Sequence, residues 1–275
     1  MSEKKEKINF IFWGTPDVAS ETLEMLKASG YLPSLIITSP DKPQGRKMIL
    51  TPPPVKTWAI ENDIPYMQPE KLDDITQKLQ EIHPDLSIVV AYGKIIPEEI
   101  LNTPRLGSIN VHYSLLPKYR GASPVESAVL NGDTETGVAV QKMVYKMDAG
   151  DILAIDKTPI GDTETSPLLR KRLIKIGGDL LIKMLPDFID GKITPLAQDE
   201  SNMTHCKKIQ KEDGEIDLND SAVKNYNKYR AYINWPRTFF FKDGKRIIIT
   251  DARLENGKFV IKKVIPEGGK EQDLI

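Results

Sequence analysis

Apolar residues along this chain gather in short continuous runs that are separated by longer amphipathic stretches. The runs at Ile8–Trp13, Leu32–Thr38 and Asp85–Ala91 have the length and the composition of buried strands. The stretches that begin near Asp17 and near Ser166 place their apolar residues at helical spacing. Strands that alternate with helices predict an α/β fold with a mostly parallel, Rossmann-like sheet, whose ligands bind at the carboxyl ends of the strands.

The last part of the chain has a different pattern. Residues 194–220 are polar and lack periodicity, and beyond them two apolar runs flank Lys242-Asp243-Gly244-Lys245, which is typical of a hairpin turn. We therefore predict an α/β domain over residues 1–193, a linker over 194–208 and a small β-rich domain over 209–275. Trp235 and Phe239–Phe241 are expected in the core of the small domain.

Two local signals concern helix starts. The turn Gly14-Thr15-Pro16 follows the first strand but lacks the G-x-G-x-x-G pattern, so an ordinary strand-to-helix turn is favoured over a dinucleotide site. Ser123-Pro124-Val125-Glu126 has the form of a capping box with proline at the first helical position, and Gly132 is expected to end that helix.

Composition excludes several classes of protein. The single Cys206 cannot form a disulfide within the chain, and the three histidines show no metal-ligand spacing, so we expect no metal. No apolar stretch reaches the roughly 20 residues of a membrane span, and the mixed-charge N-terminus does not look like a secretion signal. We expect a cytoplasmic protein without a membrane partner, and a monomer.

Charge is unevenly distributed along the chain. The formal net charge is −1, yet residues 205–275 carry 15 Lys and Arg against 11 Asp and Glu. A basic C-terminal part on an acidic body suits a polyanionic partner, although a lysine-rich solvated surface would have the same composition.

The candidate chemistry lies in the segment 108–124. Ile109, Val111 and Tyr113 alternate there with Asn110 and His112, so a strand would project the amide and the imidazole from one face. Asn can donate to a developing oxyanion, and His titrates near neutral pH, which together indicate acyl-type chemistry. A nearby carboxylate could orient the imidazole, and spacing leaves open whether Asp148 or Asp151 supplies it.

A Pro-rich segment over residues 39–54 carries Lys42, Arg46 and Lys47. Long loops inside compact domains are often functional, and basic side chains on such a loop can bind phosphate. A solvated loop without a partner is the alternative.

Eight segments, in order along the chain, carry a resemblance to a known family. They are F-W-G-T-P-D-V-A, D-K-P-Q-G-R, P-P-P-V-K, V-V-A-Y-G-K-I-I-P, S-I-N-V-H-Y-S-L-L-P-K-Y-R-G-A-S-P, M-D-A-G-D-I-L, K-I-Q-K-E-D-G-E-I-D and R-A-Y-I-N-W-P-R. With them the chain resembles the methionyl-tRNA formyltransferase family, within the larger group of 10-formyltetrahydrofolate-dependent formyltransferases. The block N-V-H-x-S-L-L-P-x-Y-R-G with a downstream D-x-G-D is the most specific part.

The resemblance implies an activity and its co-substrates. A formyl group would pass from 10-formyltetrahydrofolate to the α-amino group of methionyl initiator tRNA, with no metal. Asn110, His112 and Asp148 would be the catalytic residues. The folate would contact residues of two segments, Ser114, Leu115, Leu116 and Pro117 in the first, Tyr92 and Ile95 in the second. Lys42, Arg46 and Lys47 would contact the tRNA.

The chain departs from the family pattern at two places. Arg46 is followed by Lys47-Met48-Ile49-Leu50, where the family usually has glycine and two lysines, and the C-terminal domain is short for the OB-like β-barrel that the resemblance implies. The alternatives are a formyltransferase that acts on an amino-sugar nucleotide, a 10-formyltetrahydrofolate hydrolase and a non-catalytic tRNA- or folate-binding protein.

Overall fold

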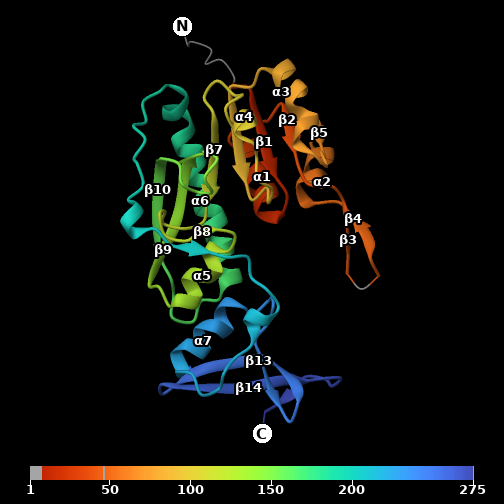
Figure 1. Ribbon diagram of the computed structural model, residues 1–275, viewed down its shortest axis with the longest axis vertical. Helices are drawn as coiled ribbons and strands as arrows, with labels where there is room; N and C mark the ends of the chain where they lie inside the picture. Colours follow the sequence, from red (N-terminus) through yellow and green to blue (C-terminus); the bar gives the residue numbers. More distant parts are fainter. Residues whose placement is uncertain (1–7, 46, 275) are drawn as a thin grey trace. The chain divides into compact units, whose positions relative to one another are not determined.

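The computed structural model describes residues 8–45 and 47–274, and within them the chain forms two compact units (Figure 1). The first unit comprises residues 8–116, 138–156 and 174–200, and the second comprises residues 117–137, 157–173 and 201–274. The helices of the described residues are α1 Asp17–Ala28, α2 Pro54–Glu61, α3 Thr76–Ile82, α4 Glu98–Leu101, α5 Pro124–Asn131, α6 Ser166–Ile189 and α7 Ala222–Ala231.

A mostly parallel sheet carries the candidate site. Among the described residues its seven strands follow the order β10-β9-β7-β6-β1-β2-β5. Strands β5, β2, β1, β6 and β7 pair in parallel, whereas β9 pairs with β7 in the antiparallel sense. The strand bounds are β1 Phe10–Gly14, β2 Leu35–Ile37, β5 Tyr66–Met67, β6 Leu86–Val90, β7 Ser108–His112, β9 Glu135–Lys142 and β10 Ile152–Pro159.

The central strands are apolar on both faces because helices cover the sheet, as parallel sheets require. Every residue of β1 and β6 is buried. At the end of β1, Gly14 meets the start of α1 so closely that an added Cβ would lie 2.5 Å from the Cβ of Ala19. The Gly14 turn is thus the tight strand-to-helix turn that the sequence predicts.

Short strand pairs lie outside the main sheet. The predicted loop over residues 39–54 contains a two-stranded antiparallel hairpin, β3 Lys42–Gln44 and β4 Ile49–Thr51, which projects away from the sheet (orange in Figure 1). In the second unit, β8 Arg120–Gly121 pairs in parallel with β11 His205–Cys206.

Helix α5 confirms part of the capping prediction and corrects the rest. Pro124 occupies the first turn, and Gly132 ends the helix with a left-handed φ of 72°. The Ser123 side chain, however, makes no capping hydrogen bond, so the predicted capping box is wrong. Glu126, its expected partner, is instead engaged by the guanidinium of Arg170.

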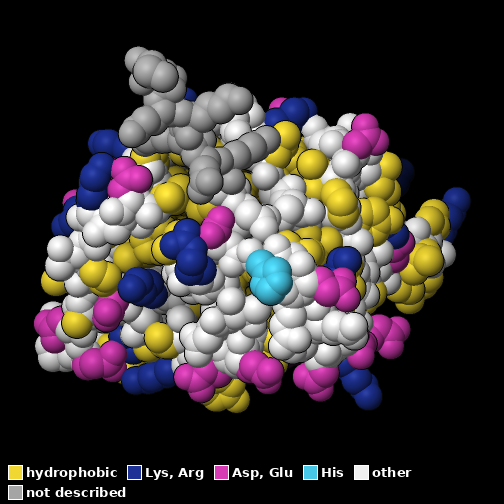
Figure 2. Space-filling model, turned by 90° about the horizontal axis from the view of Figure 1, so that it is seen from above, with side chains coloured by type: hydrophobic (Ala, Val, Ile, Leu, Met, Phe, Trp, Pro, Cys, Tyr) yellow, Lys and Arg dark blue, Asp and Glu magenta, His cyan; other side chains and the backbone are white. Residues whose placement is uncertain are grey.

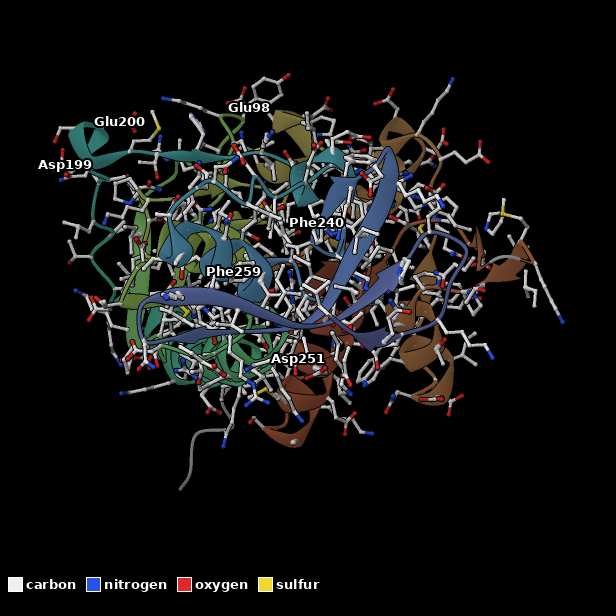
Figure 3. The ribbon with its side chains drawn as sticks, turned by 90° about the horizontal axis from the view of Figure 1, so that it is seen from below. Glu98, Asp199, Glu200, Phe240, Asp251 and Phe259 are labelled. Atoms are coloured by element: carbon white, nitrogen blue, oxygen red, sulfur yellow. The ribbon has the colours of Figure 1, made fainter. Side chains whose placement is uncertain are left out.

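The C-terminal part forms an open antiparallel sheet packed on α7. Its strands are β12 Phe239–Lys242, β13 Lys245–Glu255, β14 Lys258–Pro266 and β15 Gln272–Asp273, paired in that order. Phe240 and Phe259, labelled in Figure 3, come from β12 and β14 and belong to one apolar cluster with Tyr226 and Tyr229 of α7. Within the described residues β12 and β15 do not pair, so the sheet is open, whereas the resemblance implies an OB-like β-barrel.

The expected position of Trp235 in this core is wrong. Its side chain is 55% exposed, and so is that of Phe241, whereas Phe239 and Phe240 are buried. Trp235 precedes a cis peptide bond to Pro236 in the turn that leads to β12, and a turn residue has no sheet neighbour to cover it.

Candidate active site

The alternation in β7 gives this strand one polar and one apolar face. A Cβ added at Gly177 of α6 would lie 3.1 Å from Cγ1 of Val111 and 3.2 Å from Cε1 of Tyr113. Val111 and Tyr113 therefore face α6. Asn110 and His112, each one residue out of step with them, project from the opposite face. The predicted sharing of one face by the amide and the imidazole is confirmed.

The structure selects one aspartate for His112. The distance from His112 Nδ1 to Asp148 Oδ1 is 3.7 Å, and both side chains are largely withdrawn from water, at 7% and 15% exposure. Asp151 is exposed, and its carbonyl oxygen accepts a hydrogen bond from the Lys142 amide at 2.9 Å. Asp148 is thus the carboxylate that spacing alone left undecided.

A tight turn between β9 and β10 presents Asp148. The Asp148 backbone has a φ of +51°, in the left-handed region that aspartate tolerates better than most residues. Two residues later, an added Cβ at Gly150 would lie 1.8 Å from the Lys142 carbonyl oxygen, so only glycine fits. The D-A-G-D segment therefore has a geometric reason for both its aspartate and its glycine.

Two glutamines that were not predicted as site residues hold this turn. Gln141 is the β9 partner of Asn110 in the sheet register, is 1% exposed, and donates from Nε2 to Asp148 Oδ1 at 3.0 Å. Gln198 donates from Nε2 to the carbonyl oxygens of Asp148 at 2.9 Å and Gly150 at 2.7 Å. Pairing β7 with β9 places Gln141 opposite Asn110, so Gln141 could have been predicted from that pairing. Nothing in the sequence pointed to Gln198.

The residues expected to contact folate follow β7 and β6. In the first segment, Ser114 and Leu116 are buried, whereas Leu115 and Pro117 are partly exposed.

In the second segment, Tyr92 is 2% exposed and its ring packs edge-on against Trp13 at 5.3 Å, so its side chain belongs to the core. Burial raises the pKa of the Tyr92 phenol to about 12. The Tyr92 carbonyl accepts a hydrogen bond from Thr15 Oγ1 at 3.1 Å, while Ile95 is 68% exposed. Of the two residues expected here, Ile95 therefore exposes its side chain, whereas Tyr92 could offer a ligand only its backbone.

The expected tRNA-contacting lysines lie on the exposed β3–β4 hairpin. Lys42 and Lys47 are both exposed, and Arg46 lies outside the described residues. The apolar residues Met48, Ile49 and Leu50 are 61–68% exposed.

An ion pair fixes the base of the hairpin. Lys56 Nζ lies 2.7 Å from Asp41 Oδ2, and Gln68 Nε2 donates to Asp41 Oδ1 at 2.7 Å. Two hydrogen bonds to the Asp41 carboxylate hold its pKa below its usual value. The bond from Gln68 contributes most, and the bond from Lys56 contributes next. The base of the hairpin is thus held together by an ion pair and a hydrogen bond at Asp41.

Three further features are the surface charge, the grouping of metal-ligating side chains and the apolarity of the helices. On the face shown in Figure 2, basic and acidic side chains are interspersed among apolar ones, without a large patch of one sign. Among residues 8–45 and 47–274, no three His, Cys, Asp or Glu side chains gather as metal ligands. In the same described part of the chain, no helix has the length and apolarity to cross a membrane.

Comparison with known proteins decides the family. The model of the family described as formyl transferase matches residues 6–185, and that of the formyl transferase C-terminal domain matches residues 208–272. This chain belongs to the formyl transferase family. The resemblance found in the sequence motifs is therefore confirmed, and the protein is a formyltransferase.

Relatives within the family are similar over most of their length. A methionyl-tRNA formyltransferase from Sulfurihydrogenibium sp. is 40% identical over 247 residues, which cover 89% of this chain and 79% of that protein. One from Staphylococcus epidermidis is 39% identical over 267 residues, with 96% and 86% covered.

Solved structures share the fold at lower identity. An N-formyltransferase from Helicobacter canadensis, crystallised with folinic acid and dTDP-3-aminofucose, superposes with a TM-score of 0.71 at 18% identity, covering 90% of this chain and 88% of that one. At these identities the likeness confirms the α/β formyltransferase fold and does not distinguish among acceptors.

Proposed function

We propose that this formyltransferase moves the formyl group of 10-formyltetrahydrofolate to the α-amino group of methionyl initiator tRNA. The observation that carries the proposal is the pairing of His112 with Asp148 beside Asn110, in a chain about 40% identical to methionyl-tRNA formyltransferases. The relatives' names supply the acceptor, because the site geometry alone suits any amine.

Each of these three residues has a separate role in the acyl transfer. As the methionyl nitrogen attacks the formyl carbon, negative charge develops on the formyl oxygen, and the Asn110 amide donates a hydrogen bond to it. His112 accepts the proton that the attacking nitrogen loses and delivers it to N10 of the folate as the carbon–nitrogen bond breaks. Asp148 orients the imidazole and stabilises it while it is charged.

Binding residues follow from the same proposal. Ser114, Leu115, Leu116 and Pro117, with the backbone of the segment that contains Tyr92 and Ile95, would line the folate site. Lys42, Arg46 and Lys47 would contact phosphates of the tRNA, which a projecting hairpin can reach.

The domain layout and the setting belong to the proposal as well. Residues 1–193 would form the catalytic domain and residues 209–275 a tRNA-binding domain, in keeping with the two matched families at 6–185 and 208–272. Initiator tRNA is used in translation, so we place the protein in the cytoplasm.

A three-arm transfer assay tests the function. The protein is incubated with 10-formyltetrahydrofolate labelled in the formyl group and with methionyl initiator tRNA, an amino-sugar nucleotide or water alone. Label in formylmethionyl-tRNA supports the proposal. Label in the sugar or in formate, with none in the tRNA, would replace the proposal with a sugar formyltransferase or a folate hydrolase, and no transfer in any arm would reject it.

A further inference from the structure

The segment Leu196–Glu200 lies along the turn that presents Asp148. Leu196 and Ile152 exchange two backbone hydrogen bonds, with the Leu196 amide 2.9 Å from the Ile152 oxygen and the Ile152 amide 2.8 Å from the Leu196 oxygen. At the other end, Lys146 Nζ lies 3.3 Å from Glu200 Oε2. The segment is therefore attached on both sides of the turn. Asp199 and Glu200, labelled in Figure 3, are exposed, whereas Gln198 is half-buried and directs its side-chain amide to the turn.

The amide of Gln198 is matched to the turn. Its Nε2 carries two hydrogens, and two carbonyl oxygens, those of Asp148 and Gly150, lie at 2.9 and 2.7 Å from it. The Asp148 residue has left-handed backbone geometry, which persists only where surrounding groups hold it. Hydrogen bonds to the carbonyls on both sides of Ala149 fix the backbone from which the Asp148 side chain projects.

A second contact links Gln198 to the carboxylate itself. Gln198 Nε2 lies 3.4 Å from Oε1 of Gln141, and Nε2 of Gln141 donates to Asp148 Oδ1 at 3.0 Å. The same Oδ1 lies 3.7 Å from His112 Nδ1. Gln198 is thus connected to the imidazole through two routes, one through the backbone of the turn and one through Gln141.

We propose that Gln198 is a positioning residue for the transfer reaction, which holds Asp148 in place against His112. The inference rests on the proposed function, because it assumes that the His112–Asp148 pair takes part in transfer. Gln198 acts on the imidazole through the Asp148 backbone and through Gln141, which makes it a positioning residue. Small displacements of catalytic groups are costly, and a shift of about 1 Å can reduce turnover roughly 10²-fold.

The first test is a double-mutant cycle on the full chain. Gln198→Leu removes the donor at similar volume, and Asp148→Asn removes the charge that Gln198 would position. We expect Gln198→Leu to lower kcat about 10- to 100-fold with little change in KM, and to lower it less than about twofold further in the Asp148→Asn background. Equal losses in both backgrounds would overturn the inference. Gln80→Leu, at an exposed position on α3, is the matched control and should retain normal turnover.

The cycle separates this inference from the proposed function. If Asp148→Asn leaves kcat unchanged, the catalytic assignment fails. If Asp148→Asn lowers kcat but Gln198→Leu does not, only the positioning role fails. Should Gln198→Leu not fold, Gln198→Glu keeps the shape but presents an acceptor to both carbonyls, and the same losses are expected.

A spectroscopic readout distinguishes positioning from a general loss of stability. The chain has three histidines, so imidazole-¹⁵N spectra contain three sets of signals, and those of His112 are identified by their loss in His112→Gln. In folded Gln198→Leu the signals of His112 should shift, while those of His83 and His205 stay in place. Unchanged His112 signals would overturn the inference.

Discussion

Replacing Gly150 by alanine tests whether the geometry of the Asp148 turn sets the rate. The added Cβ would stand 1.8 Å from the Lys142 carbonyl oxygen, whereas real Cβ atoms essentially never approach closer than 3.0 Å. The atoms nearest to this Cβ all belong to the Lys142 backbone, so no side chain can rotate away, and the turn must move by about 1.2 Å, the difference between these distances. The movement strains the hydrogen bond from Gln198 to the Gly150 oxygen.

We expect this displacement to lower kcat about 10²-fold, since the carboxylate would no longer stand at its present distance from His112. Overpacking should also cost about 1–3 kcal/mol of unfolding free energy, so the variant should remain folded at 25 °C if the parent has ordinary stability. Steady-state transfer to methionyl initiator tRNA gives kcat and KM for both substrates, and urea unfolding gives the stability.

A glycine elsewhere in the chain supplies the control. At Gly161 an added Cβ would meet its nearest neighbour, Cβ of Glu164, at 3.5 Å, which is ordinary contact, so Gly161→Ala should retain the rate. The reasoning is refuted if folded Gly150→Ala keeps kcat within about threefold of the parent. It is also refuted if Gly161→Ala loses as much activity, because the loss would then not depend on the turn.

Three further predictions address the reaction, the acceptor and the core. Asn110→Ala and His112→Ala should each lower turnover roughly 10²–10⁴-fold, and near-normal rates for both would reject the assigned roles. Replacing Lys42 and Lys47 by alanine should weaken tRNA binding and reduce the slope of log affinity against log salt by about 2; an unchanged slope would show that these lysines contact no phosphate. Burial raises the pKa of the Tyr92 phenol to about 12 in the folded protein, from about 10 in the unfolded chain. This difference contributes up to about 3 kcal/mol to the stability of the fold below pH 10, and the contribution is lost as the pH rises from 10 through 12. Tyr92→Phe should therefore lose less unfolding free energy than the parent between pH 10 and 12 in urea titrations, and equal losses would contradict the shift.

The fold and the reactive strand could be predicted because each depends on local patterns. A buried parallel strand is a continuous apolar run, and the alternation from Ile109 to Tyr113 fixes which side chains share a face. Long-range partners are not encoded this way. Spacing could not choose between Asp148 and Asp151, because the choice depends on how the turn folds back over β9.

Gln198 is a second residue whose contacts could not be predicted from the sequence. It lies in a polar segment without periodicity, which we predicted to begin a linker. Two backbone hydrogen bonds between Leu196 and Ile152 bring its segment to the turn, and the pairing of a single residue leaves no recognisable pattern in the sequence. The prediction for Trp235 was wrong for a different reason, because it relied on residue type alone. Aromatic character predicts burial on average, but Trp235 lies in the turn before β12 and its ring is exposed.

Two motifs that appear separate in the sequence form one structural unit. Asp41 belongs to D-K-P-Q-G-R and Lys56 to P-P-P-V-K, and their ion pair closes the base of the β3–β4 hairpin at 2.7 Å. The lowered pKa of Asp41 means that this carboxylate keeps its charge to a lower pH than an ordinary aspartate. Asp41 and Lys56 of these two motifs therefore hold the base of the hairpin, whereas Lys42 of the first motif is exposed. Contacts with a partner would come from its exposed residues, where this chain has the apolar Met48 and Ile49 at the two positions that carry lysines in the family pattern.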